Sequence, residues 1–265
     1  MYPVLINLGP IPIHTYGFLI AVGFLVALSV LRKLSIATKM NADVILDLAF
    51  WSLLVGFIGA RVLFIITRAG DFWADPLSMF KVWQGGLVFY GGLLSAIPFD
   101  IWYIRKHKLP IWQTIDILVP GLAIAQMFGR LGCLSAGCCY GKPTGSDFGI
   151  RFYSDLVDQS MRGIPLHPTQ LYEATVLMII FLGLLYTFKN KKFHGQVAFT
   201  YLFSYSVGRF IVEIFRGDQI RGQVFDLMST SQAISILTFI GASIVLSFRL
   251  KSLGYFGAKA NKHRK

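Results

Sequence analysis

Three arginines and the chain's only two glutamates lie inside long apolar segments, where an ionisable side chain is costly and usually retained for function. They are Arg61, Arg130, Arg209, Glu173 and Glu213. Arg209 and Glu213 are four residues apart, so they can pair on one face of a helix. Arg61 and Arg130 have no acidic residue within a helical turn, so each requires a partner on another helix or a bound anion. A phosphate suits the guanidinium group, which donates two parallel hydrogen bonds.

Histidine and tyrosine side chains lie near the starts of other apolar segments: His14, Tyr16, Tyr90, His167 and Tyr172. Such groups can act as general bases or as hydrogen-bond donors to an anion. The alternative for each residue taken singly is snorkelling to the headgroup boundary, or structural pairing. Because the whole set falls toward one end of the apolar segments, we expect one polar site at that depth.

Two glycine pairs flank the aromatic start of one apolar segment, and they are Gly85-Gly86 and Gly91-Gly92. Bare backbone allows a lipid headgroup or a second helix to approach closely. Gly91 and Gly92 are therefore candidates for substrate binding, and ordinary small-residue helix packing is the alternative.

The elements that position these residues are membrane helices. The 265-residue chain is 55% hydrophobic and 14% charged, with a mean hydropathy of +0.61, which excludes a soluble globular protein. A span needs about 20 apolar residues, and seven candidates are present. We expect an all-α, polytopic protein with helices over roughly 15–31, 46–66, 86–104, 115–135, 172–188, 196–216 and 228–248.

The basic residues indicate the orientation of these helices. Of the 25 lysines and arginines, 15 follow the first, third, fifth and seventh spans, and cytoplasmic loops are the basic ones. We expect the N-terminus outside, the C-terminus inside, an ordered extracytoplasmic cap over 137–171 and a basic cytoplasmic tail over 249–265. This pattern explains the net charge of +12 by orientation, without a nucleic-acid partner. The chain is expected to form one integral-membrane domain, 1–265.

Two motifs, 129–143 with its Gly-Arg-Leu-Gly and Ala-Gly-Cys-Cys-Tyr-Gly stretches and 167–173 with His-Pro-Thr-Gln-Leu-Tyr-Glu, resemble the bacterial prolipoprotein diacylglyceryl transferases. Further similar motifs occur in the same order at 9–10, 14–17, 74–76, 82–92, 208–216 and 231–232. The resemblance implies a seven-helix inner-membrane enzyme. Such an enzyme transfers the diacylglyceryl group of phosphatidylglycerol to the lipobox cysteine thiol of a prolipoprotein, forming a thioether and releasing glycerol phosphate.

The resemblance also implies roles for single residues. Arg130 matches the family arginine that binds the phospholipid headgroup, and Arg209 matches a second essential arginine. Tyr16, Gly137, Glu213 and the motif from His167 to Glu173 fall on family positions. Three residues depart from the pattern, because Tyr90 replaces a histidine, Cys133 an asparagine and Cys138 a glutamate. A mechanism that depends on that histidine is therefore in doubt, and the chain is a candidate for a variant subgroup.

Alkylation of a thiol requires a thiolate and a stabilised phosphate leaving group. Candidate bases are His167, Glu213 and Tyr90, and arginine-assisted thiolate formation, with Glu213 positioning Arg209, is the favoured alternative. The expected catalytic residues are Arg209, Glu213, Tyr16, Tyr90 and His167. The expected substrate-binding residues are Arg130, Arg61, His14, Gly91, Gly92, Gly137 and Glu173. We expect no cofactor and no metal, since the His and Cys spacing fits no zinc signature.

Cys133, Cys138 and Cys139 support two other interpretations. They predict either a membrane thiol oxidoreductase or a structural disulfide with one thiol left over. A non-catalytic lipid-binding or transport protein is a further alternative, although no polar residue set continues to the inner side. The expected partners are phosphatidylglycerol, prolipoprotein signal peptides and membrane lipids, and the protein is expected to be a monomer.

Overall fold

The computed structural model of the chain describes residues 4–8, 11–72, 77, 79, 85–154, 156–216, 223–224 and 228–254. The motif segments 9–10, 74–76 and 82–84 and most of the tail, 255–265, lie outside these residues. The helices are α1 Thr15–Ala37, α2 Ala42–Thr67, α3 Phe89–Lys106, α4 Ile111–Ala136, α5 Thr169–Asn190, α6 Gln196–Ile214 and α7 Thr230–Ser252.

The predicted seven helices are confirmed in the described part of the chain, and several extend beyond the predicted ends. Hydropathy locates the apolar centre of a helix, whereas capping sets its ends. The α2 helix begins four residues earlier than predicted because Oδ1 of Asn41 accepts hydrogen bonds from the N–H groups of Asp43 (3.0 Å) and Val44 (3.4 Å). Likewise, Ser229 and Gln232 form a capping box at the start of α7.

Six of the seven helices are long and apolar enough to cross a membrane, and α3 is the exception. Its 18 residues include Asp100, Arg105 and Lys106. The membrane-spanning character of six helices agrees with the prediction, whereas that of α3 stays a prediction.

Six short strands, which the sequence did not predict, form three antiparallel pairs in the described residues. They are β1 Val4–Leu8 with β2 Ile11–His14, β3 Ile150–Arg151 with β4 Pro165–Leu166, and β5 Gln223–Val224 with β6 Met228–Ser229. Four of them are two residues long, too short for an alternating pattern to be visible in a sequence.

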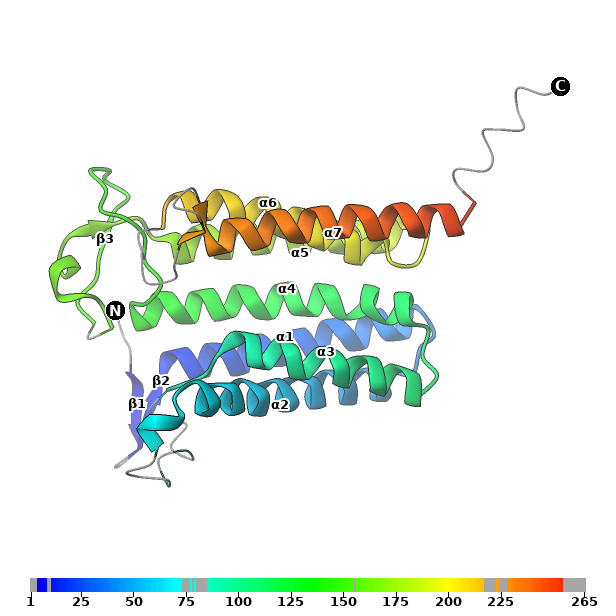
Figure 1. Ribbon diagram of the computed structural model, residues 1–265, viewed down its shortest axis with the longest axis horizontal. Helices are drawn as coiled ribbons and strands as arrows, with labels where there is room; N and C mark the ends of the chain where they lie inside the picture. The colour runs from blue at the N-terminus through cyan, green and yellow to red at the C-terminus, as the bar shows by residue number, and fades with distance from the viewer. Residues whose placement is uncertain are drawn as a thin grey trace. The chain divides into compact units, whose positions relative to one another are not determined.

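The chain divides into two compact units, residues 28–118 and residues 1–27 with 119–265. In the first of these, α2 and α3 lie side by side (Figure 1). Their contact is made by small residues: a Cβ at Gly91 would meet Cβ of Leu63 at 2.5 Å, and one at Gly92 would meet the carbonyl oxygen of Gly56 at 3.0 Å. Leu48, Tyr103 and Ile104 form the buried core of this unit.

In the other unit, α6 packs against both α5 and α7, and α4 runs alongside them (Figure 1). Ile124 and Met127 of α4 meet Ala174 and Leu177 of α5 in a buried core. Close packing of α5 and α6 depends on Gly208, where a Cβ would meet Cγ1 of Val176 at 2.5 Å. These contacts fix the helix faces on which the polar residues lie.

The segment between α4 and α5, called the cap here, is folded at the ends of these helices (Figure 1), and its extracytoplasmic location stays a prediction. Phe152, Val157 and Leu166 form its buried core, against which Tyr140 packs. A pair of backbone hydrogen bonds joins Lys142 to His167 and Phe215, at 3.0 and 2.9 Å. These bonds attach the cap to the start of α5 and to the end of α6, the two helices that contain Glu173, Arg209 and Glu213.

Candidate functional site

The site forms where α4, α5 and α6 place charged residues near the cap. Arg130 lies in the last two turns of α4, Glu173 in the second turn of α5, and Arg209 and Glu213 in the last two turns of α6. Glu173 follows the buried Thr169 and Gln170, whose side chains bond to the cap. The first turn of α5 is thus held by the cap.

Glu173 is the centre of an ion-pair network. Its Oε1 lies 2.9 Å from Nη2 of Arg130, and its Oε2 lies 3.3 Å from Nη1 of Arg209. Arg209 also pairs with Glu213, its Nη2 lying 2.8 Å from Oε2 of that residue. The pairing of Arg209 with Glu213, predicted from their spacing, is confirmed. Arg130 has the partner from another helix that the sequence required, and this partner is Glu173.

Arg216 and Ser231 complete this cluster, and the list of candidate site residues drawn from the sequence omitted both. Nη1 of Arg216 lies 3.9 Å from Glu173, and its Nε lies 3.9 Å from Glu213. Ser231, at the start of α7, accepts a hydrogen bond of 3.0 Å from Nη2 of Arg209. The sequence did contain a sign that Arg216 belongs to the site, because it follows Glu213 by three residues and lies in the motif 208–216.

The five charged residues of this cluster contain three guanidinium groups and two carboxylates, so their charges leave an excess of one positive charge. Four of them are buried, whereas the side chain of Arg130 is 23% exposed. Arg130 is therefore the member from which an anion can be approached. A singly charged phosphodiester would neutralise the set.

His167 lies beside the cluster, at the start of α5. Its Nδ1 lies 3.2 Å from the hydroxyl of Tyr172, and its ring packs edge-on against Phe215, with centroids 5.3 Å apart. Phe215 directly precedes Arg216. The structure thus places one candidate base next to the cluster, whereas Glu213 is engaged with two guanidinium groups.

Other predicted residues of this unit are less closely connected. His14 and Tyr16, at the junction of β2 and α1, are exposed, and Tyr16 contacts the backbone face of α4 at Gly132, where a Cβ would meet its ring at 2.9 Å. Gly137 ends α4 in the left-handed region, with φ of +77°. Glycine adopts this positive φ without a steric penalty, so the end of α4 is a structural reason for a glycine at residue 137.

Arg61, Tyr90, Gly91 and Gly92 belong to the unit of residues 28–118. Arg61 donates from Nε to the carbonyl oxygen of Met79 (2.9 Å) and from Nη1 to those of Gly85 (2.6 Å) and Gly86 (2.9 Å). These three partners of Arg61 are backbone carbonyls, rather than the acidic residue or bound anion that the sequence predicted. Tyr90 is half exposed at the start of α3, and Gly91 and Gly92 form the packing contact with α2.

Cys133, Cys138 and Cys139 gather where α4 ends; none forms a disulfide, and their Sγ atoms lie within 4.8 Å of one another. Hydrogen bonds from the Cys133 and Cys138 thiols, followed by the charges of Arg216 and Arg130, lower the pKa of Cys139. Hydrogen bonding with Cys133 and Cys139 raises the pKa of Cys138. Negative charge on this trio is thus favoured at Cys139.

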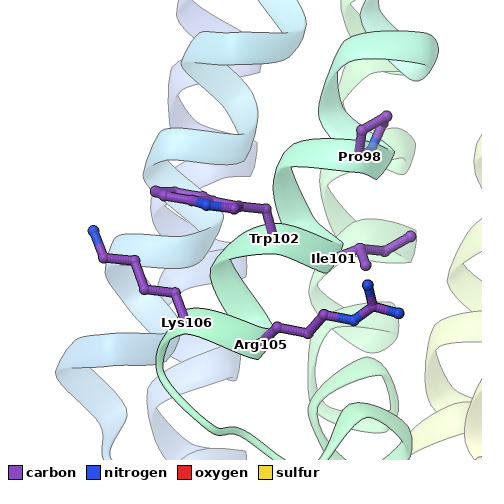
Figure 2. A pocket seen from close by; sticks show the side chains of 5 residues that line it. All are labelled: Pro98, Ile101, Trp102, Arg105 and Lys106. Carbon is purple, nitrogen blue, oxygen red and sulfur yellow. The ribbon is translucent and has the colours of Figure 1, made fainter.

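A hollow of about 580 Å³ lies elsewhere, on the surface of α3 (Figure 2). Its lining residues are Pro98, Ile101, Trp102, Arg105 and Lys106. Nζ of Lys106 lies 4.7 Å from the Trp102 ring centroid. Tryptophan with basic residues at a helix end is typical of a membrane interface, and this lining offers no acid, thiol or imidazole.

Known proteins identify the family. The family model described as prolipoprotein diacylglyceryl transferase matches residues 3–248. The chain is 37% identical over 240 residues to the phosphatidylglycerol-prolipoprotein diacylglyceryl transferase of Clostridium tetani, covering 91% of this chain and 94% of that protein. Identity is 35% over 248 residues to enzyme 2 of that name from Clostridium perfringens, covering 93% and 95%. With these matches and the ion-pair cluster that its motifs form, the chain belongs to the prolipoprotein diacylglyceryl transferase family.

Proposed function

We propose that this protein transfers the diacylglyceryl group of phosphatidylglycerol to the lipobox cysteine thiol of a prolipoprotein. The sulfur forms a bond to the glycerol carbon, the bond from that carbon to the phosphate oxygen breaks, and glycerol phosphate leaves. The observation on which the proposal depends is the charged cluster around Glu173, with its excess positive charge and its exposed member Arg130.

Arg130 and Arg209 bind the phosphate in this mechanism. The leaving phosphate gains negative charge as the carbon–oxygen bond breaks, and guanidinium groups already in place stabilise that charge without reorganising. Glu173 contacts both arginines, at 2.9 and 3.3 Å, and so sets the separation of the two guanidinium groups. Glu213 and Ser231 hold Arg209 from the other side, and we assign Glu213 a positioning role.

The thiol proton must leave before or during the attack, because the thiolate is the nucleophile. The positive charges of the cluster favour a thiolate close to them, which supports arginine-assisted ionisation. His167, hydrogen-bonded to Tyr172, is the candidate acceptor in the same unit. Tyr16 and Tyr90 are proposed to contact the substrate, and Tyr90, Cys133 and Cys138 are proposed to mark a variant subgroup.

The acyl chains need an apolar path from the cluster into lipid. A groove of about 160 Å³ between α6 and α7 is lined by apolar residues such as Phe210, Ile211 and Phe239. Phe210 directly follows Arg209, and Ser235 of the lining lies one helical turn after Ser231. This groove supports a phospholipid with its phosphate at Arg130 and Arg209 and an acyl chain along α6.

The proposed setting is the bacterial inner membrane, with the cap and the cluster toward the outer leaflet and the protein acting as a monomer. His14, Arg61, Gly91, Gly92 and Gly137 are retained as candidates for binding the lipid or shaping its site. No cofactor is part of this mechanism.

The test uses purified protein in nanodiscs with phosphatidylglycerol and a lipobox peptide, and follows the peptide mass. We expect a diacylglyceryl mass gain, and we expect Arg130→Ala to lower kcat/KM by about 100-fold or more, as for loss of a charge-stabilising donor. Arg130→Lys keeps the charge but loses the planar fork, so its activity should be intermediate.

Arg105→Ala is the matched control, because Arg105 is an exposed arginine on α3, and this change should leave the rate unchanged. A peptide that gains no mass despite lipid binding would refute the transfer. Equal activity in Arg130→Ala and wild type would refute the assigned phosphate site.

A further inference from the structure

The three cysteines of the chain meet at the end of α4, although their spacing in the sequence fits no zinc signature. Their Sγ atoms all lie within 4.8 Å of one another, and none is in a disulfide. Three sulfur atoms at about 2.3 Å from one zinc ion lie about 3.8 Å apart in tetrahedral geometry. Bringing each separation to this value requires a change of at most about 1 Å.

The backbone brings the thiols together. Gly137 ends α4, and the N–H of Cys138 donates to the carbonyl oxygen of Cys133 at 3.1 Å, which turns the chain back toward the helix. Cys139 has φ of +62°, a left-handed conformation that is unfavourable for a residue with a side chain. Its carbonyl oxygen accepts a 2.8 Å hydrogen bond from Oγ1 of Thr169, so the turn is fixed by α5.

Gln170 supplies a second, independent observation. The side chain is 1% exposed, and its Nε2 donates to the carbonyl oxygen of Cys138 at 2.7 Å. Its Oε1 is buried and has no hydrogen-bond partner among the residues that the structure describes. A buried acceptor beside the cysteine turn suits a donor that is not part of the chain, such as a water molecule bound to a metal ion.

The positive charge of the cluster around Glu173 is also compatible with a metal ion bound by the three cysteines. A divalent ion with three thiolates has a net charge of −1, and the cluster around Glu173 has an excess of one positive charge. Arg216 and Arg130 lie close enough to Cys139 to interact with its charge. These two guanidinium groups would therefore favour the negative charge of the thiolates, in a part of the protein where a charge without a nearby partner is costly.

A disulfide explains the trio less well. Cys138 and Cys139 are adjacent, so their Cα atoms are about 3.8 Å apart, below the usual range of about 4.4–6.8 Å for disulfides. Only a pair that includes Cys133 remains, and it would leave the third thiol unused.

We propose that Cys133, Cys138 and Cys139 bind one zinc ion through three thiolates, with a fourth coordination position left for water or an added thiol. This site goes beyond the transferase function and does not depend on it. On binding, the three thiols release their protons to solvent and three sulfur–zinc bonds form. Thiolate ligands select such an ion over Mg²⁺ or Ca²⁺.

The test is the zinc content of full-length protein purified under reducing conditions, together with Zn²⁺ competition against a chromogenic chelator. We expect one zinc per chain, three reduced thiols after denaturation with chelator, and no competition by Mg²⁺. Cys133→Ser and Cys139→Ser should each weaken binding by about 100-fold or more, since losing even an outer partner of a metal ligand costs about 10–100-fold. Ser135→Ala is the matched control between two of the ligands, and should bind as wild type does.

Co²⁺ substitution provides a measurement that needs no variant, because sulfur ligands give Co²⁺ an intense charge-transfer band. The proposal is wrong if three reduced thiols are present without stoichiometric zinc and without this band. It is equally wrong if a single reduced thiol is found in protein that is two hydrogen atoms lighter, which indicates a disulfide, or if the serine variants bind Zn²⁺ as tightly as wild type.

Discussion

At the scale of single residues, Glu173 connects guanidinium groups from two helices and from the segment after α6. We expect Glu173→Gln, which keeps the shape and removes the charge, to reduce transfer more than 10-fold. Its removal also leaves the three arginines with the carboxylate of Glu213 alone, and the loss of one partner of a buried ion pair costs about 3–5 kcal/mol. Transfer to a lipobox peptide and the thermal unfolding midpoint in detergent measure the two effects.

Asp147→Asn is the control for this change, since it removes a carboxylate from an exposed position of the cap. It should alter neither quantity. If Glu173→Gln retained both wild-type activity and wild-type stability, Glu173 would not position the arginines.

The sequence predicted part of this cluster, and the missing part depends on packing. Spacing within one helix is visible in a sequence, so the pair of Arg209 with Glu213 was predicted. The contact of Arg130 with Glu173 depends on which faces of α4 and α5 meet, and no local pattern gives that. Arg216 was overlooked because it is the last residue of the predicted span 196–216, where a basic side chain is expected to face the interface, whereas it is buried against two carboxylates.

At the scale of elements, the contact between α2 and α3 depends on glycine. We expect Gly91→Ala to destabilise the protein by about 1–3 kcal/mol, as overpacking does, because its Cβ would meet backbone of Gly59 and Cβ of Leu63. Gly241→Ala is the matched control in α7, where the structure leaves open space, and it should be neutral or stabilising by about 1 kcal/mol.

Thermal unfolding and lipid kinetics together separate the two roles considered for Gly91. A packing role lowers the unfolding midpoint. A rise in KM for phosphatidylglycerol with an unchanged midpoint would instead place Gly91 in the lipid site.

The cap is the second element whose packing can be tested. Phe152 is fully buried in the cap core, so Phe152→Ala should destabilise the cap by about 3–5 kcal/mol and expose it to limited proteolysis. Phe148→Ala, at a residue that is 83% exposed, is the control. Equal proteolysis of both variants would show that the cap does not depend on this core.

The helices were predicted better than the rest of the fold because an apolar run of about 20 residues is a strong signal. Their ends depend on caps such as Asn41, and the short strands depend on contacts between distant segments. Ile150 pairs with Leu166, for example, only because the cap folds back on itself. Hydropathy contains no information about either feature.

At the scale of the whole molecule, the number of crossings depends on α3. Its 18 residues span about 27 Å, slightly less than the roughly 30 Å of the hydrocarbon core. Arg105 and Lys106 in its last turn can snorkel to the interface, and they extend the basic loop pattern predicted for the inner side. We therefore expect α3 to cross, which gives seven crossings.

Short protease-cleavable tags inserted after Gly70, Lys108, Gly145 and Gly254 can count these crossings in intact cells. We expect cleavage from outside after Gly70 and Gly145, and cleavage after Lys108 and Gly254 only once the membrane is permeabilised. The Gly70 and Gly145 sites leave space for an added group, so the tags should be tolerated, and transfer activity checks that each tagged protein is folded. Since α4 separates Lys108 from Gly145, that pair is the internal control. Protection of the Gly70 tag would mean that α3 does not cross and that α2 ends on the cytoplasmic side.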